Sequence, residues 1–325
     1  IIGIVDTGID FTHPDFRNAD DTTRILKLWD QDPTNVKSTD LGSIPDGYTE
    51  EDGHEYDSLD INYALSQPIQ NMHDYVAQRD TNGHGTHVAG IATGNGRGDA
   101  RYKGVAPEAG IVFVKYKEEG QGLDTAFQSY VSDAMSYIHN FAKTNSQPCV
   151  ISISLGTHWG AHDGTSLLEK QIDFISSEGT TVVVAAGNEG QSSRHISGDV
   201  SNGSVINEFY LSRTPGLIPY PVNVCHNIWY DNCDRIDIRL TTPNPPISYY
   251  CSAPPSAGTN PVQGEYENIE FEIISTVNTV TSGLGNNIIM YIHGEVEATK
   301  LWTIEFIGTQ RSEERRVGKE CRSRW

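Results

Sequence analysis

Short apolar runs alternate with helix-like patterns over about the first 190 residues of the chain. From Phe127 to Phe141, apolar residues recur at i, i+3, i+4 and i+7, and Pro148 follows, which predicts an amphipathic helix that ends before the proline. Alternation of strands and helices is typical of a parallel sheet with helices on both faces, so we predict an α/β fold. The predicted strands are residues 1–5, 111–115, 149–154 and 181–186.

A second helix is predicted between the last two of these strands, at residues 166–178. Ser166 and Glu169 have the spacing of a capping box, in which each side chain bonds the backbone N–H at the other position. Gly179 stands where helices commonly end.

Residues 17–79 interrupt the alternation with an acidic segment. It holds 13 Asp or Glu against 5 Lys or Arg, with a strand-like stretch at 25–29 and a short helical pattern at 60–65. We expect a surface insertion here.

Between about residues 207 and 308 the apolar period changes to two. This period, with Pro-rich and Gly-rich turns between the runs, predicts an inserted antiparallel β module, jelly-roll-like. The expected domains are therefore residues 1–200 and a β module at 201–310. The period is clearest in Ile236, Ile238 and Leu240, in Ile269, Phe271 and Ile273, and in Trp302, Ile304 and Phe306.

Both ends of the sequence are expected to be cut ends. The chain starts at Ile1 inside a predicted core strand without an initiator Met, so a targeting or pro-segment is expected to have been lost and the compartment stays open. Residues 311–325 hold 9 charged positions without a hydrophobic period and resemble the conceptual translation of a sequencing-adapter oligonucleotide. The alternative is a natural basic tail.

Composition narrows the classes of partner. A net charge of −20 argues against nucleic acid and anionic membranes, which are polyanions, and no apolar run approaches the roughly 20 residues of a membrane-spanning helix. The oligomeric state stays open.

The five cysteines show neither CxxC pairs nor metal-ligand spacing, so we expect no metal and no cofactor. Calcium is possible but not indicated, since the acidic segment lacks a D-x-D-x-D-G loop.

The strongest candidate for chemistry among the carboxylates is Asp6, in VDTGID. It ends a predicted buried strand and precedes a glycine turn, and α/β sheets bind ligands beyond the carboxyl ends of their strands. Asp10 is the rival, but it follows the turn and is expected to cap the approach to His13. A purely structural Asp6 that caps its own turn is the remaining alternative.

His84, in NGHGTHVAG, is the candidate base. Histidine is the side chain whose free imidazole titrates near neutral pH, and the glycines around this position permit close approach of backbone and substrate. Metal binding by His84 and His87 is the alternative, but their spacing is three rather than four and no Glu follows His84. We expect His87 to pack inside the helix.

The order of the motifs D-T-G-I-D, H-G-T-H-V-A-G, S-L-G and A-A-G-N resembles the subtilase family of serine peptidases. The resemblance covers residues 1–190 well. The acidic segment and the position of the β module are similar to the subtilases of clostridia and their relatives that cleave a cortex-lytic pro-enzyme in spores. A secreted or spore-associated location would be compatible with this resemblance, but the localisation stays open.

The resemblance implies roles for individual residues of a polypeptide-cleaving enzyme. Asp6 would orient His84, His84 would act as base and then acid, and Asn188 would donate its amide to the oxyanion. An extended substrate would pair with one segment and place a side chain in a pocket lined by another. These segments are Ser154, Leu155 and Gly156 for the pairing, and Ala185, Ala186 and Gly187 for the pocket.

The family's nucleophile stands in G-T-S-x-A-x-P, after the Asn motif. The one G-T-S of this chain, at 164–166, precedes Asn188 and continues as Leu-Leu, so we interpret Ser166 as a helix cap. The nucleophile is then expected beyond the truncated C-terminus, and this fragment is expected to be inactive. Two alternatives to an enzyme stay open: a pseudoprotease that binds partners, and a β module that binds ligands in its own right.

Overall fold

The computed structural model describes residues 1–117, 124–158, 160–176, 179–188, 190–191, 197–200, 203–211, 220–230, 234–254, 258–277, 286–296 and 300–311. The chain divides into two compact units: residues 1–158 with 167–188, and residues 159–166 with 189–325. The division lies after Asn188, whereas the sequence suggested one after residue 200. Glu178 and residues 312–325 lie outside the described residues.

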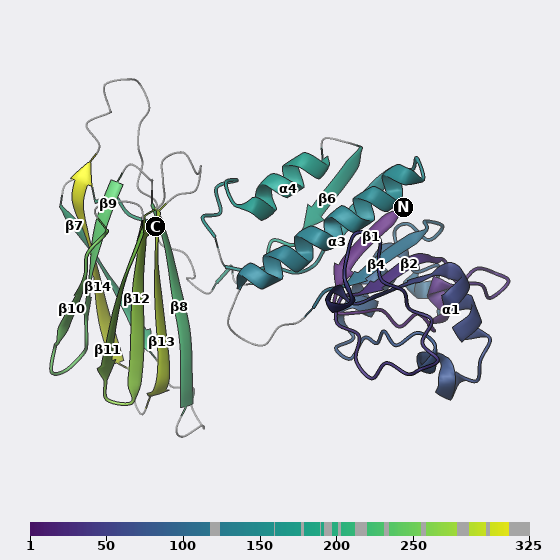
Figure 1. Ribbon diagram of the computed structural model, residues 1–325, viewed down its shortest axis with the longest axis horizontal. Coiled ribbons are helices and arrows are strands. Elements are labelled where there is room, and N and C mark those ends of the chain that lie inside the picture. Colours follow the sequence, from purple (N-terminus) through teal and green to yellow (C-terminus); the bar gives the residue numbers. More distant parts are fainter. Residues whose placement is uncertain are drawn as a thin grey trace. The chain divides into compact units, whose positions relative to one another are not determined.

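The first unit is built on a six-stranded sheet with the order β3-β2-β4-β1-β5-β6. Figure 1 labels β1, β2, β4 and β6 of this sheet. All neighbouring strands are parallel except β3, which is antiparallel to β2 at one side of the sheet. The predicted parallel sheet is therefore confirmed, with one antiparallel edge strand. The strands are β1 (Ile2–Asp6), β2 (Ile25–Asp30), β3 (His54–Asp57), β4 (Ile111–Lys115), β5 (Cys149–Ile153) and β6 (Thr180–Val184).

Helices cover both faces of this sheet, as predicted. On one face, Ile4 of β1 and Phe113 of β4 share a buried cluster with Ile61 of α1 and Ala89 of α2. On the other face, Val5 and Val112 pack with residues of α3 and α4. The helices are α1 (Ser58–Leu65), α2 (His84–Thr93), α3 (Asp124–Thr144) and α4 (Leu167–Ser176), and short 3-10 helices occur at η1 (Pro14–Phe16), η2 (Glu50–Asp52), η3 (Ile69–Asp74) and η4 (Ala100–Tyr102).

The acidic segment 17–79 is only partly the surface insertion that its charge suggested. Its strand β2 pairs with β4 inside the sheet, and Ile25, Leu28 and Trp29 are buried. Burial of these apolar side chains on both faces of the sheet outweighs the acidic composition of the flanking residues.

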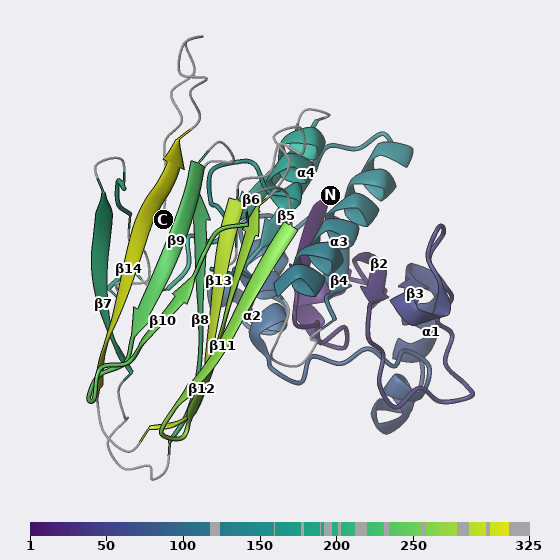
Figure 2. The same cartoon turned by 60° about the vertical axis from the view of Figure 1, so that its left-hand side comes forward.

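The second unit contains the predicted antiparallel β module. The module consists of two four-stranded sheets, β10-β9-β14-β7 and β11-β12-β13-β8 (Figure 2). Both sheets contribute to one buried cluster that includes Ile238, Phe271 and Trp302. The alternate apolar positions read from the sequence form this core. The strands are β7 (Ser204–Leu211), β8 (Tyr220–Tyr230), β9 (Asp234–Thr241), β10 (Ser248–Cys251), β11 (Gly258–Tyr266), β12 (Ile269–Val277), β13 (Asn286–Val296) and β14 (Lys300–Arg311).

The carboxyl ends of β4, β1, β5 and β6 meet at one side of the first unit, here called the carboxyl edge. The register aligns the last residues of β5 and β6 with Val5 of β1. Asp6, Ser154 and Ala185 follow them, and the Ala185 N–H donates to the carbonyl of Ile153 at 3.0 Å. Three of the predicted site segments therefore begin next to one another at the carboxyl edge.

Candidate active site

Asp6 is the last residue of β1, and its side chain is fully buried. Its Oδ1 accepts a hydrogen bond from the backbone N–H of Thr7 at 2.8 Å and lies 2.7 Å from Nδ1 of His84. Its Oδ2 has no hydrogen-bond partner among the described residues. Since a buried carboxylate is costly unless it is paired, the contact with His84 is central to this site.

His84 is the first residue of α2 and follows Gly83, which has the left-handed φ of 84°. The next residue, Gly85, is packed so closely that a Cβ there would lie 2.1 Å from the carbonyl oxygen of Gly8 and 3.1 Å from Cβ of Asp6. Only glycine permits this approach of the helix to the turn after β1. The two glycines thus bring His84 to Asp6 across 78 residues of sequence.

The Asp6–His84 pair is arranged for proton transfer at the outer nitrogen of the ring. When Asp6 is ionised it can only accept hydrogen bonds, and a neutral imidazole facing it then carries its proton on Nδ1 and keeps its free lone pair on Nε2. The His84 side chain is 45% exposed while that of Asp6 is 0% exposed. The imidazole can therefore take a proton from a hydroxyl at its open side while the buried carboxylate stabilises the imidazolium.

The other predicted site residues follow β5 and β6 at the carboxyl edge. Leu155 packs partly into the core beside β5, and Gly156 is exposed. Residues 185–188 are exposed, and Gly187, with φ 86°, makes the turn before Asn188. The sheet brings these segments to the same edge as Asp6, and their roles stay predictions.

The rival Asp10 has the local role expected for it. Its Oδ1 accepts hydrogen bonds from the backbone N–H and the hydroxyl of Thr12, at 3.0 and 2.6 Å, so it caps the turn before His13.

The expectation for His87 is wrong, because its side chain is exposed. Gly85 and Ala89, four residues apart, face the rest of the unit and are buried, so His87, two residues from each, points away from it. No group of three or more His, Cys, Asp or Glu side chains suited to a metal occurs in the part of the chain that the structure describes.

Ser166 directly precedes α4, which begins at Leu167 and has Glu169 in its first turn. This is the position of a helix cap, as the sequence suggested. The preceding Thr165 bonds Asp163 through both its N–H and its hydroxyl.

Asp80 also lies at this site, although no motif pointed to it. Its carboxylate accepts hydrogen bonds from Thr7, next to Asp6, and from Thr86, in the first turn of α2. An Asp four residues before His84, together with a Thr directly after Asp6, is the signal that the sequence offers.

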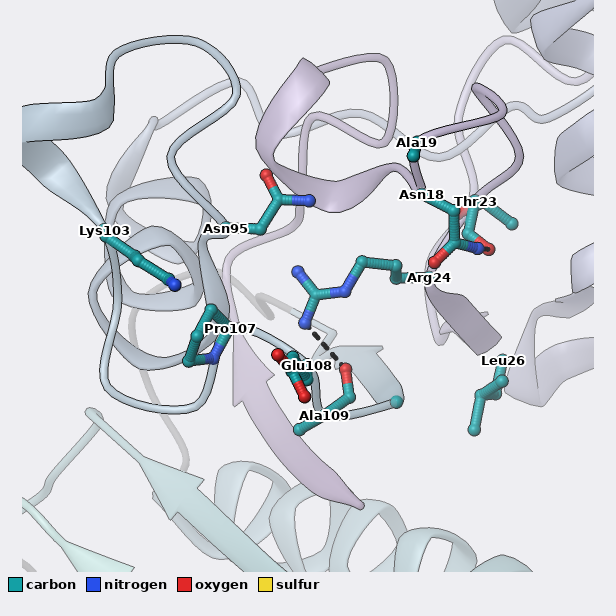
Figure 3. A pocket seen from close by; sticks show the side chains of 11 residues that line it. Asn18, Ala19, Thr23, Arg24, Leu26, Asn95, Lys103, Pro107, Glu108 and Ala109 are labelled. Atoms are coloured by element: carbon teal, nitrogen blue, oxygen red, sulfur yellow. Dashed lines mark hydrogen bonds between the residues drawn. The ribbon is translucent and has the colours of Figure 1, made fainter.

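A cavity of about 400 Å³ lies at the opposite side of the sheet, where β2 and β4 begin (Figure 3). Its buried Arg24 donates to the carbonyls of Asp15 and Thr93 at 3.1 and 2.6 Å, and to that of Ala109 at 2.7 Å. Burial lowers the pKa of Arg24. Because the guanidinium is engaged by backbone carbonyls, its role is structural, and this cavity is separate from the Asp6–His84 pair.

The fold and the contact define an α/β protein with a buried carboxylate paired to an imidazole at the carboxyl edge of its parallel sheet. The sequence of residues 1–294 matches the protein-family model of the subtilase family, and the chain belongs to that family.

The chain is similar to several proteinases. It is 29% identical over 219 residues to the PII-type proteinase of Lacticaseibacillus paracasei, covering 66% of this chain and 10% of that protein. It is 29% identical over 191 residues to a thermophilic serine proteinase of Bacillus sp. (strain AK1), covering 59% of this chain and 33% of that protein. The chain thus spans a small part of these relatives.

A solved structure, the CspB protease of Clostridium perfringens, is similar over 96% of this chain and 60% of its own, with a TM-score of 0.69 and 26% identity. This similarity extends over both units and so includes the β module. In the part of the chain that the structure describes, no helix is long and apolar enough to cross a membrane.

Proposed function

We propose that this chain is part of a serine endopeptidase that hydrolyses polypeptides through an acyl-enzyme. The observation that carries the proposal is the 2.7 Å contact between buried Asp6 and half-exposed His84 at the carboxyl edge. Membership of the subtilase family and the proteinase names of the relatives support it.

In this proposal Asp6 and His84 are two members of a Ser-His-Asp triad. His84 Nε2 takes the proton of the serine hydroxyl as the serine attacks the scissile carbonyl carbon. The carbonyl π bond opens to an oxyanion, which the side-chain amide of Asn188 stabilises. His84 then gives the proton to the leaving amine, and water repeats the cycle to release the acyl group.

Substrate recognition is proposed for the segments that follow β5 and β6. Ser154, Leu155 and Gly156 would pair with an extended peptide by adding it to the sheet edge, using main-chain hydrogen bonds. Residues 185–187 would line the pocket for the side chain before the scissile bond. The short side chains of Ala185, Ala186 and Gly187 leave space for that purpose.

The nucleophile is proposed to lie outside these 325 residues. The sequence holds no G-T-S-x-A-x-P, and Ser166 occupies a cap position before α4. The 325-residue chain is therefore expected not to form an acyl-enzyme.

A fluorophosphonate probe, which phosphonylates activated serines, tests this assignment. We expect the full-length protein to be labelled at a serine C-terminal to Asn188, while the 325-residue chain stays unlabelled; mass spectrometry of the labelled peptide locates the residue.

Labelling of Ser166 in either protein would overturn the assignment of the nucleophile. A full-length protein that takes no label and cleaves neither casein nor a chromogenic peptide would favour the pseudoprotease, which binds partners without cutting them.

A further inference from the structure

Asp80 accepts five hydrogen bonds from the segments around the Asp6–His84 contact. Oδ1 accepts from the Thr7 hydroxyl at 3.1 Å and from the N–H groups of Asn82 and Gly83 at 3.2 and 2.8 Å. Oδ2 accepts from the N–H and the hydroxyl of Thr86 at 2.9 and 2.6 Å. All five bonds run toward the carboxylate, which matches its ionised, acceptor-only form.

This carboxylate sets the direction of two further hydrogen bonds. Each threonine hydroxyl must donate its single proton to Asp80, so each is left to accept. The Thr7 oxygen accepts from the N–H of Gly85 at 3.0 Å, and the Thr86 oxygen accepts from the N–H of Asp10 at 2.8 Å.

These two hydrogen bonds, here called the threonine bridges, join the turn after β1 to the first turn of α2. In one of them the threonine lies in the turn, and in the other it lies in the helix. One joins the residue after Asp6 to the residue after His84, and the other joins the helix to the far end of the same turn. They therefore fix the turn after β1 against the first turn of α2, where a Cβ on Gly85 would already clash. Asp80 lies in a third segment and accepts a hydrogen bond from the hydroxyl of each threonine.

The ionised form of Asp80 is favoured by the same contacts. Partial burial by itself raises the pKa of Asp80, but the hydrogen bonds from Thr86, Gly83 and Thr7 outweigh it and hold the pKa below its ordinary value. The carboxylate therefore stays an acceptor throughout the pH range in which a histidine titrates.

We propose that Asp80 is a positioning residue that sets the orientation of His84 relative to Asp6 by directing the Thr7 and Thr86 bridges. This inference rests on the proposed function for its effect on catalysis. It also predicts an effect on the His84 imidazole that does not depend on turnover.

The test compares Asp80→Asn with the wild type in the full-length protein. Asparagine keeps the shape of the side chain but replaces one acceptor oxygen by an NH₂ donor. This NH₂ group would face backbone N–H donors, with which it cannot form a hydrogen bond, and a threonine hydroxyl beside it would have to accept instead of donate. A displacement of reacting groups by about 1 Å costs up to about 100-fold in rate, so we expect kcat to fall about 10- to 100-fold with little change in KM.

The basicity of His84 provides the second readout. Asp6 stabilises the protonated imidazole, so a poorer alignment should lower the His84 pKa, measured by ¹⁵N-histidine NMR titration and by the acid limb of kcat/KM. We expect the change to be a decrease relative to the wild type, because an opposite charge in contact favours the protonated imidazole.

Two sets of variants separate positioning from helix capping. Thr86→Val removes the hydroxyl and should follow Asp80→Asn, whereas Thr86→Ser keeps it and should match the wild type. Asp57→Ala is the control for a lost helix cap, because Asp57 caps α1 through the N–H groups of Leu59 and Asp60 and alanine has no acceptor for them. It should lower Tm without changing kcat or the His84 pKa.

The proposal is overturned if Asp80→Asn and Thr86→Val lower Tm but leave both kcat and the His84 pKa at wild-type values. If the wild type cleaves no peptide, the proposed function fails while the NMR titration still decides the role of Asp80. If Asp80→Asn does not fold, the comparison of Thr86→Val with Thr86→Ser decides it.

Discussion

Replacement of His84 by alanine in the full-length protein is expected to abolish peptide hydrolysis. Without the imidazole, the serine hydroxyl stays protonated near neutral pH and is a weak nucleophile, and loss of the base in serine proteases lowers kcat by about 10⁶-fold. Steady-state kinetics with a chromogenic peptide measure the effect. KM is not expected to account for it, because His84 acts on the nucleophile and not on the bound ground state.

His54→Ala is the matched control. His54 also contacts a carboxylate, with Nδ1 3.1 Å from Oδ1 of Asp40, but it lies on β3 at the far side of the sheet from β1. Its loss should leave kcat within a few-fold of the wild type. Equal loss of activity in the two variants would mean that the effect of His84→Ala is one of folding and not of proton transfer.

Asn188→Ala is expected to lower kcat by about 10²- to 10³-fold with little change in KM. The oxyanion exists only after the serine has attacked, so its donor contributes to the transition state and hardly to substrate binding. Asn188→Asp keeps the size of the side chain but loses the amide donor, so it should be at least as slow as the alanine variant.

Ser166→Ala provides the contrast. As a cap of α4, Ser166 should contribute at most about 1 kcal/mol to stability, and its loss should leave kcat nearly unchanged. A folded but inactive Ser166→Ala protein, beside an active Asn188→Ala protein, would contradict both assignments.

The sequence predicted the sheet well where apolar runs are uninterrupted. The residues of β4 are those predicted, 111–115, because a continuous run of Val, Ile and Phe suits a strand buried on both faces, and β5 differs from its prediction by one residue. The period of two likewise predicted the core of the β module, including Phe271 and Trp302.

The composition of the acidic segment concealed that its strand-like stretch at 25–29 belongs to the sheet, as β2, and gave no sign of β3. β2 mixes the apolar Ile25, Leu28 and Trp29 with charged Lys27 and Asp30, and its burial depends on pairing with β4, which lies more than 80 residues later. The charge of residues 17–79 carries no information on a pairing with a strand so far away in the sequence. The salt bridge of Asp30 to Lys115, at 3.1 Å, is part of the same pairing.

At the site, single residues were predictable and their network was not. Asp6 and His84 stand in motifs, and a strand end and a glycine-flanked helix start imply where they lie. Asp80 belongs to none of the four motifs. Its proposed role depends on hydrogen bonds from Thr7 and Thr86, which are far apart in sequence and are brought together by the fold. His87 was misplaced because its exposure is set by which face of α2 meets the sheet.

The comparison of Asp6→Ala in the wild-type and His84→Ala backgrounds tests most directly whether Asp6 and His84 act as one catalytic unit. If the carboxylate works only through the imidazole, Asp6→Ala should lower kcat by about 10⁴-fold in the wild type and hardly further once His84 is gone, since triad members are strongly non-additive. An unchanged kcat of Asp6→Ala in the wild type, or an equal further loss in the His84→Ala background, would contradict the account.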